Sequence, residues 1–136
     1  MRFNYTHEDT GRQGEWVTYW DTGHPYMSVH FVDNKMDGTF RSWYPDGGQR
    51  TVAQMVHGER DGLYRSWYPN GQLEEEARYV KNLRCGVSYM WHMDGRVSGK
   101  ELYEGGKLVK LWTRRMNGWV MHVPRMAEEE EDVEEG

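Results

Sequence analysis

The sequence predicts an all-β protein, built as an elongated, single-layer antiparallel meander of consecutive β-hairpins. Three observations predict this fold class. Glycines recur with a 24-residue period, a stretch rich in aromatic and β-branched residues follows each glycine that opens a period, and every such stretch ends in a turn signal. The 136 residues hold 7 Trp, 9 Tyr and 16 Gly, a composition that suits half-buried strands joined by many turns.

Two sets of glycines keep one register through four units without an insertion. The first set opens the units, and the second set follows nine residues later. The first set comprises Gly14, Gly38, Gly62 and Gly86, and the second comprises Gly23, Gly47, Gly71 and Gly95. The predicted repeats therefore span residues 14–37, 38–61, 62–85 and 86–109.

Each unit begins with a strand that ends in a turn around the second glycine. Pro45 and Pro69 enter two of these turns, and Asp or Asn stands directly before the glycine in three of the four. Asp, Asn and Gly tolerate a positive φ, and proline presets the backbone at the turn entry. This combination predicts a hairpin in every unit.

The chain then returns through eight or nine residues to a second turn, such as residues 33–37. Asp37 and Asp61 each precede the glycine that opens the next unit. Hydrogen bonds from local backbone N–H groups explain these two turn residues better than paired acid–base catalysis does. Because short turns join the strands at both ends, neighbours in sequence become neighbours in the sheet.

Alternation along the strands divides the side chains between two faces. On one face we expect Arg41, Trp43, Arg65, Trp67 and Trp91, and on the other a row that includes Tyr44 and Tyr68. In the return strands apolar residues share one phase, so one face should be better buried than the other. The neighbouring Glu74, Glu75 and Glu76 are expected to form a solvated strand face.

The two ends of the chain are predicted to cap the repeats. Residues 1–13 should hold an N-terminal capping strand, and residues 110–125 a C-terminal capping hairpin with its turn at Asn117 and Gly118. Residues 126–136 should form a disordered acidic tail, because they contain seven of the 22 acidic residues.

The net charge of −5 comes from this tail, and the rest of the chain is near neutral, so a general affinity for nucleic acid is not expected. The single cysteine, Cys85, excludes an intramolecular disulfide. No stretch is as apolar and long as a membrane span, and the first residues lack the apolar segment of a signal peptide. We therefore expect a soluble, cytoplasmic protein.

Catalysis requires different residue types brought together, whereas this chain repeats the same types every 24 residues. The histidines fall at different unit positions, and no spacing resembles a zinc site with Cys85. Ser42 and Ser66 lie in the middle of predicted strands, unlike a serine nucleophile on a sharp turn. We predict no catalytic residues, no metal and no cofactor.

The candidate partner-binding residues are the arginines, tryptophans and tyrosines named above. Arg41 and Arg65 beside Trp43 and Trp67 could stack bases or hold a lipid phosphate. Since Val17 stands at the equivalent position of the first unit, cross-strand cation–π packing of these arginines explains the pattern better.

The central units resemble MORN repeats, in the variant form found in bacterial proteins often labelled as antitoxins. The resemblance is carried by Trp67, Tyr68, Pro69, Asn70, Gly71, Gln72 and Leu73, followed by Tyr79, Asn82 and Gly86. Such repeats occur in bacteria, eukaryotes and large DNA viruses. The resemblance implies successive β-hairpins in one elongated, twisted sheet, and a role in scaffolding, protein contact, dimerisation or phospholipid binding. It implies no catalytic residues. The chain departs from the pattern at Cys85, at His92-Met93 and at Gly105-Gly106.

These observations predict a non-enzymatic scaffold or protein-interaction protein that self-associates, as a homodimer, through a sheet face or a terminal edge. Its protein partner is not identified by the sequence. Two alternatives stay open: an antitoxin-like protein that neutralises a partner by direct binding, and a module that binds phospholipid or, with less support, nucleic acid.

Overall fold

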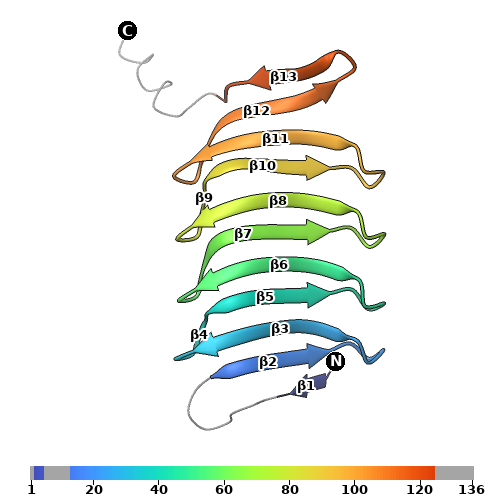
Figure 1. Ribbon diagram of the computed structural model, residues 1–136, viewed down its shortest axis with the longest axis vertical. Coiled ribbons are helices and arrows are strands. Elements are labelled where there is room, and N and C mark those ends of the chain that lie inside the picture. The colour runs from blue at the N-terminus through green and yellow to red at the C-terminus, as the bar shows by residue number, and fades with distance from the viewer. Residues whose placement is uncertain (1, 5–12, 125–136) are drawn as a thin grey trace, which may run out of the picture.

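A computed structural model describes residues 2–4 and 13–124 of the chain (Figure 1). These residues form one antiparallel sheet of 13 strands and contain no helix. The prediction of an elongated, single-layer meander of hairpins is confirmed. The predicted acidic tail, residues 126–136, and most of the predicted N-terminal segment lie outside the described residues.

The strands follow one another through the sheet in chain order. Their bounds are β1 (Arg2–Asn4), β2 (Gly14–Tyr19), β3 (Pro25–Val32), β4 (Lys35–Met36), β5 (Gly38–Trp43), β6 (Gln49–Val56), β7 (Glu59–Trp67), β8 (Leu73–Val80), β9 (Leu83–Arg84), β10 (Gly86–Trp91), β11 (Val97–Glu104), β12 (Lys107–Arg115) and β13 (Gly118–His122). The two-residue strands β4 and β9 pair only with the ends of β3 and β8, so the path runs directly from β3 to β5 and from β8 to β10.

At one end of the hairpins, each turn closes on a glycine with a positive φ. The N–H of Gly47 donates to the carbonyl of Tyr44 at 2.9 Å, and Gly71 donates to Tyr68 at the same distance. Pro45 follows Tyr44 and so occupies the second position of its turn, where a proline fits.

At the other end, the turns are tighter than the segment 33–37 that the sequence suggested. Two consecutive residues have positive φ, as at Asp33 (50°) and Asn34 (70°), and again at Lys81 (48°) and Asn82 (71°). This is the backbone of a two-residue type I′ turn, whose twist matches that of the flanking strands. The residues after the turn therefore rejoin the sheet as β4, β9 or the start of β7.

The glycine that opens each unit also has a positive φ, from 74° at Gly86 to 119° at Gly62. A Cβ at Gly62 would lie 3.1 Å from the Cβ of Gln54, so both the backbone angle and the neighbouring strand require glycine there. This explains why the glycine period is unbroken.

Each unit carries a β-bulge in its return strand. Ser66 is opposite Glu75, but the next residue, Trp67, is opposite Leu73, so Glu74 has no direct partner. The same shift occurs in the other three hairpins, where the extra residues are Tyr26, Arg50 and Ser98. A bulge bends its strand and re-aims a side chain. The bulge was not predicted from the sequence.

Directly paired residues share a face, so the register defines two faces. The serine face contains the line Thr18, Met27, Ser42, Thr51, Ser66, Glu75, Met90, Gly99, Thr113 and Val120. The arginine face contains the line Val17, Ser28, Arg41, Val52, Arg65, Glu76, Tyr89, Lys100, Trp112 and Met121.

The core lies on the serine face. Every described side chain that is buried belongs to it, namely Thr18, Val29, Phe31, Ser42, Ala53, Ser66, Ala77, Tyr79 and Ser88. The expectation that one face is better buried is thereby confirmed. The arginine face has no buried side chain among the described residues, and this leaves its aromatic and basic groups accessible.

Candidate interaction surfaces

The sequence-predicted partner-binding residues do not form one surface. Arg41 and Arg65 lie on the arginine face and, together with Trp67, line a shallow groove of about 270 Å³. By alternation Trp43 and Trp91 belong to this face as well. Tyr44 and Tyr68 line a different groove, of about 650 Å³, on the serine face, and Trp67 and Trp91 contribute to its lining as well. The chain therefore offers two candidate surfaces with different chemistry.

On the arginine face, the predicted packing of Arg41 and Arg65 on tryptophan rings is wrong. The Nε of Arg65 lies 2.8 Å from a carboxylate oxygen of Glu76, its direct cross-strand neighbour, so this arginine is paired with an acid. Arg41 is exposed and has neither an ion pair nor a ring contact in the described residues. Arg65 contacts the carboxylate of Glu76 and not a tryptophan ring because a charge-assisted hydrogen bond is the stronger contact.

Cation–π contacts occur instead at the C-terminal end of the same face. The Nζ of Lys100 lies 4.7 Å from the ring centre of Trp112 and 5.3 Å from that of Trp119. The guanidinium of Arg114 lies 5.7 Å from the ring centre of Trp119. Trp119 is 37 % exposed and Met121 is 49 % exposed, so this end combines accessible apolar side chains with positive charge.

Tyr44 and Tyr68 have a structural role that the sequence did not reveal. The hydroxyl of Tyr44 donates to the carbonyl of Trp67 at 2.6 Å, and that of Tyr68 donates to the carbonyl of Trp91 at 2.7 Å. At the first boundary, the indole N–H of Trp20 donates to the carbonyl of Trp43 at 2.9 Å. Each aromatic side chain thus joins its own hairpin to the next one.

Asp37, the aspartate before the glycine that opens the second unit, also acts between repeats. The carboxylate of Asp37 accepts a hydrogen bond from the backbone N–H of His57 at 3.2 Å, and His57 belongs to the turn of the following unit. The donor is therefore not local, as the sequence suggested, but 20 residues away. Cys85 takes the equivalent position two units after Asp37 and offers no carboxylate.

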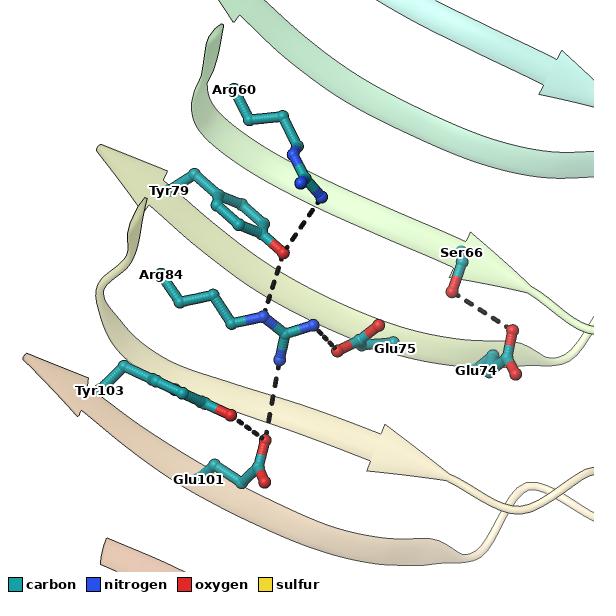
Figure 2. A network of polar contacts seen from close by, with 8 residues as sticks. All are labelled: Arg60, Ser66, Glu74, Glu75, Tyr79, Arg84, Glu101 and Tyr103. Atoms are coloured by element: carbon teal, nitrogen blue, oxygen red, sulfur yellow. Dashed lines mark hydrogen bonds and ion pairs between the residues drawn. The ribbon is translucent and has the colours of Figure 1, made fainter. Parts of the chain in front are cut away.

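A charged network lies on the serine face at the C-terminal half of the sheet (Figure 2). Arg84 of β9 forms an ion pair with Glu75 of β8, donates to the hydroxyl of Tyr79 at 3.0 Å, and has a second carboxylate, that of Glu101, at 3.7 Å. Arg60 stacks on Tyr79, with its guanidinium carbon 4.6 Å from the ring centre. Tyr79 is buried and the charged residues are partly buried, and their contacts join β7, β8, β9 and β11.

The electrostatics of this network follow from its contacts. Burial alone would lower the pKa of Arg84, but the hydrogen bond to Tyr79 and the charge of Glu75 raise this pKa above its ordinary value, so the guanidinium stays charged. Tyr103 donates to Glu101 at 3.2 Å, and burial followed by the charge of Glu101 raises the pKa of Tyr103.

This network was not predicted from the sequence, and Glu74, Glu75 and Glu76 were expected to form one solvated strand face. In the structure Glu75 pairs with Arg84 on the serine face, whereas Glu76 pairs with Arg65 on the arginine face. A usable signal was present, because Glu75 shares the alternation phase of Ala77 and Tyr79, both buried. A charged side chain at a strand position whose alternating neighbours are buried requires an oppositely charged or hydrogen-bonding partner.

The groove on the serine face runs across the hairpins beside this network. Its lining includes Tyr44, Tyr64 and Tyr68 together with Thr51 and Ser66. The bulged residue Glu74 is turned into the groove, where it accepts a hydrogen bond from Ser66 at 3.3 Å. Burial, and then the charge of Glu74, raise the pKa of Tyr44.

Residues 2–4 and 13–124, which the structure describes, lack two further kinds of site. No group of three or more His, Cys, Asp or Glu side chains is placed to hold a metal ion there. No helix in those residues is long and apolar enough to cross a membrane.

The family model of the MORN repeat variant matches residues 60–81, which run from β7 through β8 into the type I′ turn. This chain therefore carries a MORN repeat of the variant type at these residues. MORN repeats are modules that bind proteins or membranes, and they are not typically enzymatic. The match includes Arg60, Glu75 and Tyr79 of the charged network, so part of the network lies within the matched repeat of this MORN-repeat protein.

Comparison of the MORN-repeat protein with curated proteins finds no match. Among solved structures, it is similar to a crystal structure of a mutant of S. aureus TarM in complex with Fondaparinux, alpha-GlcNAc-glycerol and UDP. The two share 9 % sequence identity with a TM-score of 0.45, over 79 % of this chain and 21 % of that chain.

Proposed function

We propose that this MORN-repeat protein is a non-enzymatic interaction module that self-associates through its C-terminal edge strand, β13. The observation that carries the proposal is the exposure of β13. Trp119, Val120 and Met121 are 37 %, 41 % and 49 % exposed, and Val123 just beyond the strand is 66 % exposed. Large apolar residues therefore project from both faces of a strand that ends the strand order of the sheet (Figure 1).

An edge strand presents unpaired N–H and C=O groups, and native sheets protect such edges with charges or short lengths. Residues 118–123 contain no charged side chain apart from a protonatable His122. Antiparallel pairing of β13 with β13 of a second copy would satisfy both edges at once in a two-fold symmetric contact. Pro124 follows directly and limits the pairing to this short segment.

Such a contact would continue both faces of the sheet across the dimer axis. Trp119 and Met121 of the two copies would meet on the arginine face, and the two Val120 side chains on the serine face. Full burial of one such side chain contributes about 1.5–3 kcal/mol, but the strand is short and association itself is costly. We therefore expect a dimer that forms at micromolar concentrations and dissociates on dilution.

Size-exclusion chromatography with light scattering over a concentration series tests this proposal. The unmodified chain should shift towards twice its monomer mass as the concentration rises, and Val120→Lys should remain monomeric. Val80→Lys is the matched control, because Val80 is 51 % exposed on an interior strand. A strict monomer at high micromolar concentration, or an equal loss of dimer in the control, would contradict the edge contact.

A second candidate function is binding to an anionic phospholipid surface through the arginine face. It is favoured by one observation: free Arg41 lies on the same face as exposed Val32, Val56 and Val80, which provide apolar side chains beside positive charge. Vesicles with and without phosphatidylserine test it. Binding should require the anionic lipid, fall with salt, and weaken in Arg41→Ala and Arg65→Ala.

A further inference from the structure

The C-terminal half of the arginine face carries a group of basic side chains without acidic partners. This cationic patch consists of Arg78 on β8, Lys100 on β11, and Lys110 and Arg114 on β12. The register places all four on the arginine face, since Lys100 is opposite Trp112, and Lys110 and Arg114 alternate with serine-face residues. In the described residues none of the four forms an ion pair, and Lys100 and Arg114 contact tryptophan rings instead.

We propose that the acidic C-terminal segment, residues 126–136, docks on the cationic patch of its own chain. The segment contains seven carboxylates, Glu128, Glu129, Glu130, Glu131, Asp132, Glu134 and Glu135. Opposite charge on this scale would draw the segment to the patch and cover it. A partner could then bind the patch only by displacing the segment, so the segment would compete with that partner for the patch. The inference does not depend on self-association through β13.

The place where the chain leaves the sheet favours this occupant. β13 ends at His122, which is opposite Leu111 and therefore beside Lys110. Each residue extends the chain by at most about 3.5 Å, so the carboxylates after Pro124 can reach from roughly 14 Å to nearly 40 Å. Strands are about 4.8 Å apart, which puts Lys100 roughly 10 Å and Arg78 roughly 19 Å from β13. The whole patch is within reach.

The opposite face is a poor alternative for an acidic segment. Its groove is lined by Glu74 and Glu75, and Glu75 already neutralises Arg84. Like charges would repel the segment from that groove. On the arginine face two acids lie near the patch: Glu76, which is paired with Arg65, and Glu104 at the end of β11. The charge distribution thus distinguishes the two faces.

Zero-length carbodiimide cross-linking of the full chain, mapped by mass spectrometry, tests the docking. This reagent joins carboxylates to lysines in direct contact. We expect carboxylates 128–135 to link to Lys100 and Lys110 at least roughly fivefold more than to Lys35 and Lys81, and the links to disappear above about 0.5 M salt, where exposed ion pairs are screened. Even linkage over these four lysines, or no links to Lys100 and Lys110, would overturn the proposal.

A neighbouring pair of variants assigns the face. Arg114 and Arg115 are both exposed, but Arg114 lies on the arginine face and Arg115 on the serine face. Arg114→Glu should lower the cross-link yield to Lys100 and Lys110 several-fold, and Arg115→Glu, with the same change of charge, should leave it unchanged. An equal reduction in both variants would show general attraction without docking on this face.

Isotope labelling identifies whose patch is occupied. In an equal mixture of unlabelled and ¹⁵N-labelled chains, docking within one chain gives cross-linked peptide pairs of a single isotope composition. Mixed pairs at half of the total would mean docking on another copy and would overturn the proposal as stated. In the monomeric Val120→Lys chain the links should persist, so failure of the edge contact and failure of the docking are told apart.

Discussion

The two halves of the serine face have the same backbone, but equivalent positions are apolar in the first half and charged or polar in the second. In the first half Met27, Phe31 and Met36 form an apolar group, with Phe31 and Met36 directly paired. Two repeats later the equivalent residues are Glu75, Tyr79 and Arg84, with Tyr79 and Arg84 paired in the same way. Both halves have the same type I′ turn and the same bulge. The turns and bulges therefore determine the backbone, and the core residues must only be compatible with one another.

The difference lies in how far each residue depends on its neighbours. An apolar side chain loses only contact area when a neighbour changes. A partly buried charge loses its compensation and keeps the cost of its desolvation. The C-terminal half should therefore tolerate single substitutions less well than the N-terminal half, although the two halves have the same fold.

The largest expected effect comes from removing the central cation of the network. Arg84→Met leaves the side chains of Glu75 and Glu101, which are 20 % and 16 % exposed, without their positive partner. We expect a loss of about 2–3 kcal/mol of unfolding free energy in urea titrations, below the value for a fully buried pair because the site is partly solvated. Arg78→Met, on the other face of the same hairpin pair, should change stability by less than about 0.5 kcal/mol. Equal losses of unfolding free energy in Arg84→Met and Arg78→Met would contradict a special role for the charged network on the serine face.

The second prediction converts one half into the other. Arg84→Met combined with Glu75→Met and Glu101→Ala installs the residues that stand 48 positions earlier at Met36, Met27 and Ala53. Because no charge is left uncompensated, the triple variant should recover to within about 1 kcal/mol of the unmodified chain. A triple variant less stable than Arg84→Met alone would show that the halves differ in backbone and not only in chemistry.

The third prediction concerns a contact that the halves share. Tyr44→Phe and Tyr68→Phe each remove a hydroxyl that donates a hydrogen bond to the next hairpin. Each variant should therefore lose about 1 kcal/mol of unfolding free energy, and the two losses should be equal. Tyr89→Phe is the control, because Tyr89 makes a ring contact with Trp91 and no hydrogen bond through its hydroxyl in the described residues. Thermal unfolding of the three variants compares them directly; a loss at Tyr89 of similar size would contradict the assignment.

The smallest effect is a change in alkaline stability. Burial first, and then the charge of Glu75, raise the pKa of Tyr64 above 10.0, and the equivalent residue in the preceding repeat is the non-ionisable Phe40. A raised folded-state pKa gives stability that is complete below pH 10 and is lost as the pH rises through the folded-state value. Tyr64→Phe should therefore reduce the decline in melting temperature between about pH 9 and pH 11.5, measured for each protein relative to its own melting temperature at neutral pH. An unchanged decline would refute this contribution.

The sequence predicted the features that depend on local backbone chemistry. Gly47 after Pro45 and Asp46 marks a turn wherever it occurs, so hairpins and their period were readable from one chain. Alternation also predicted one better-buried face, which Ala53 and Ala77 occupy. These features need no knowledge of which strands pair over distance.

The features that were not predicted depend on cross-strand register. A bulge at Glu74 shifts one residue without a mark in the sequence, and it turns that side chain towards Ser66. The partners of Arg84 lie nine and 17 residues away on different strands, so no short motif contains them. Alternation did predict that Arg65 and Tyr68 lie on opposite faces, but the hydrogen bond from Tyr68 to the next hairpin depends on register and was not predicted.

The tyrosine bonds between hairpins have a consequence for how this molecule can change size. Each runs from one residue to a carbonyl 23 positions later, so a gain or loss of one whole 24-residue unit leaves every remaining bond in place. A smaller insertion would break the series at one boundary. Gain or loss of whole units therefore changes the length of the sheet only in steps of two strands, roughly 10 Å each. The length of the sheet is thus set by the number of repeats that the gene encodes.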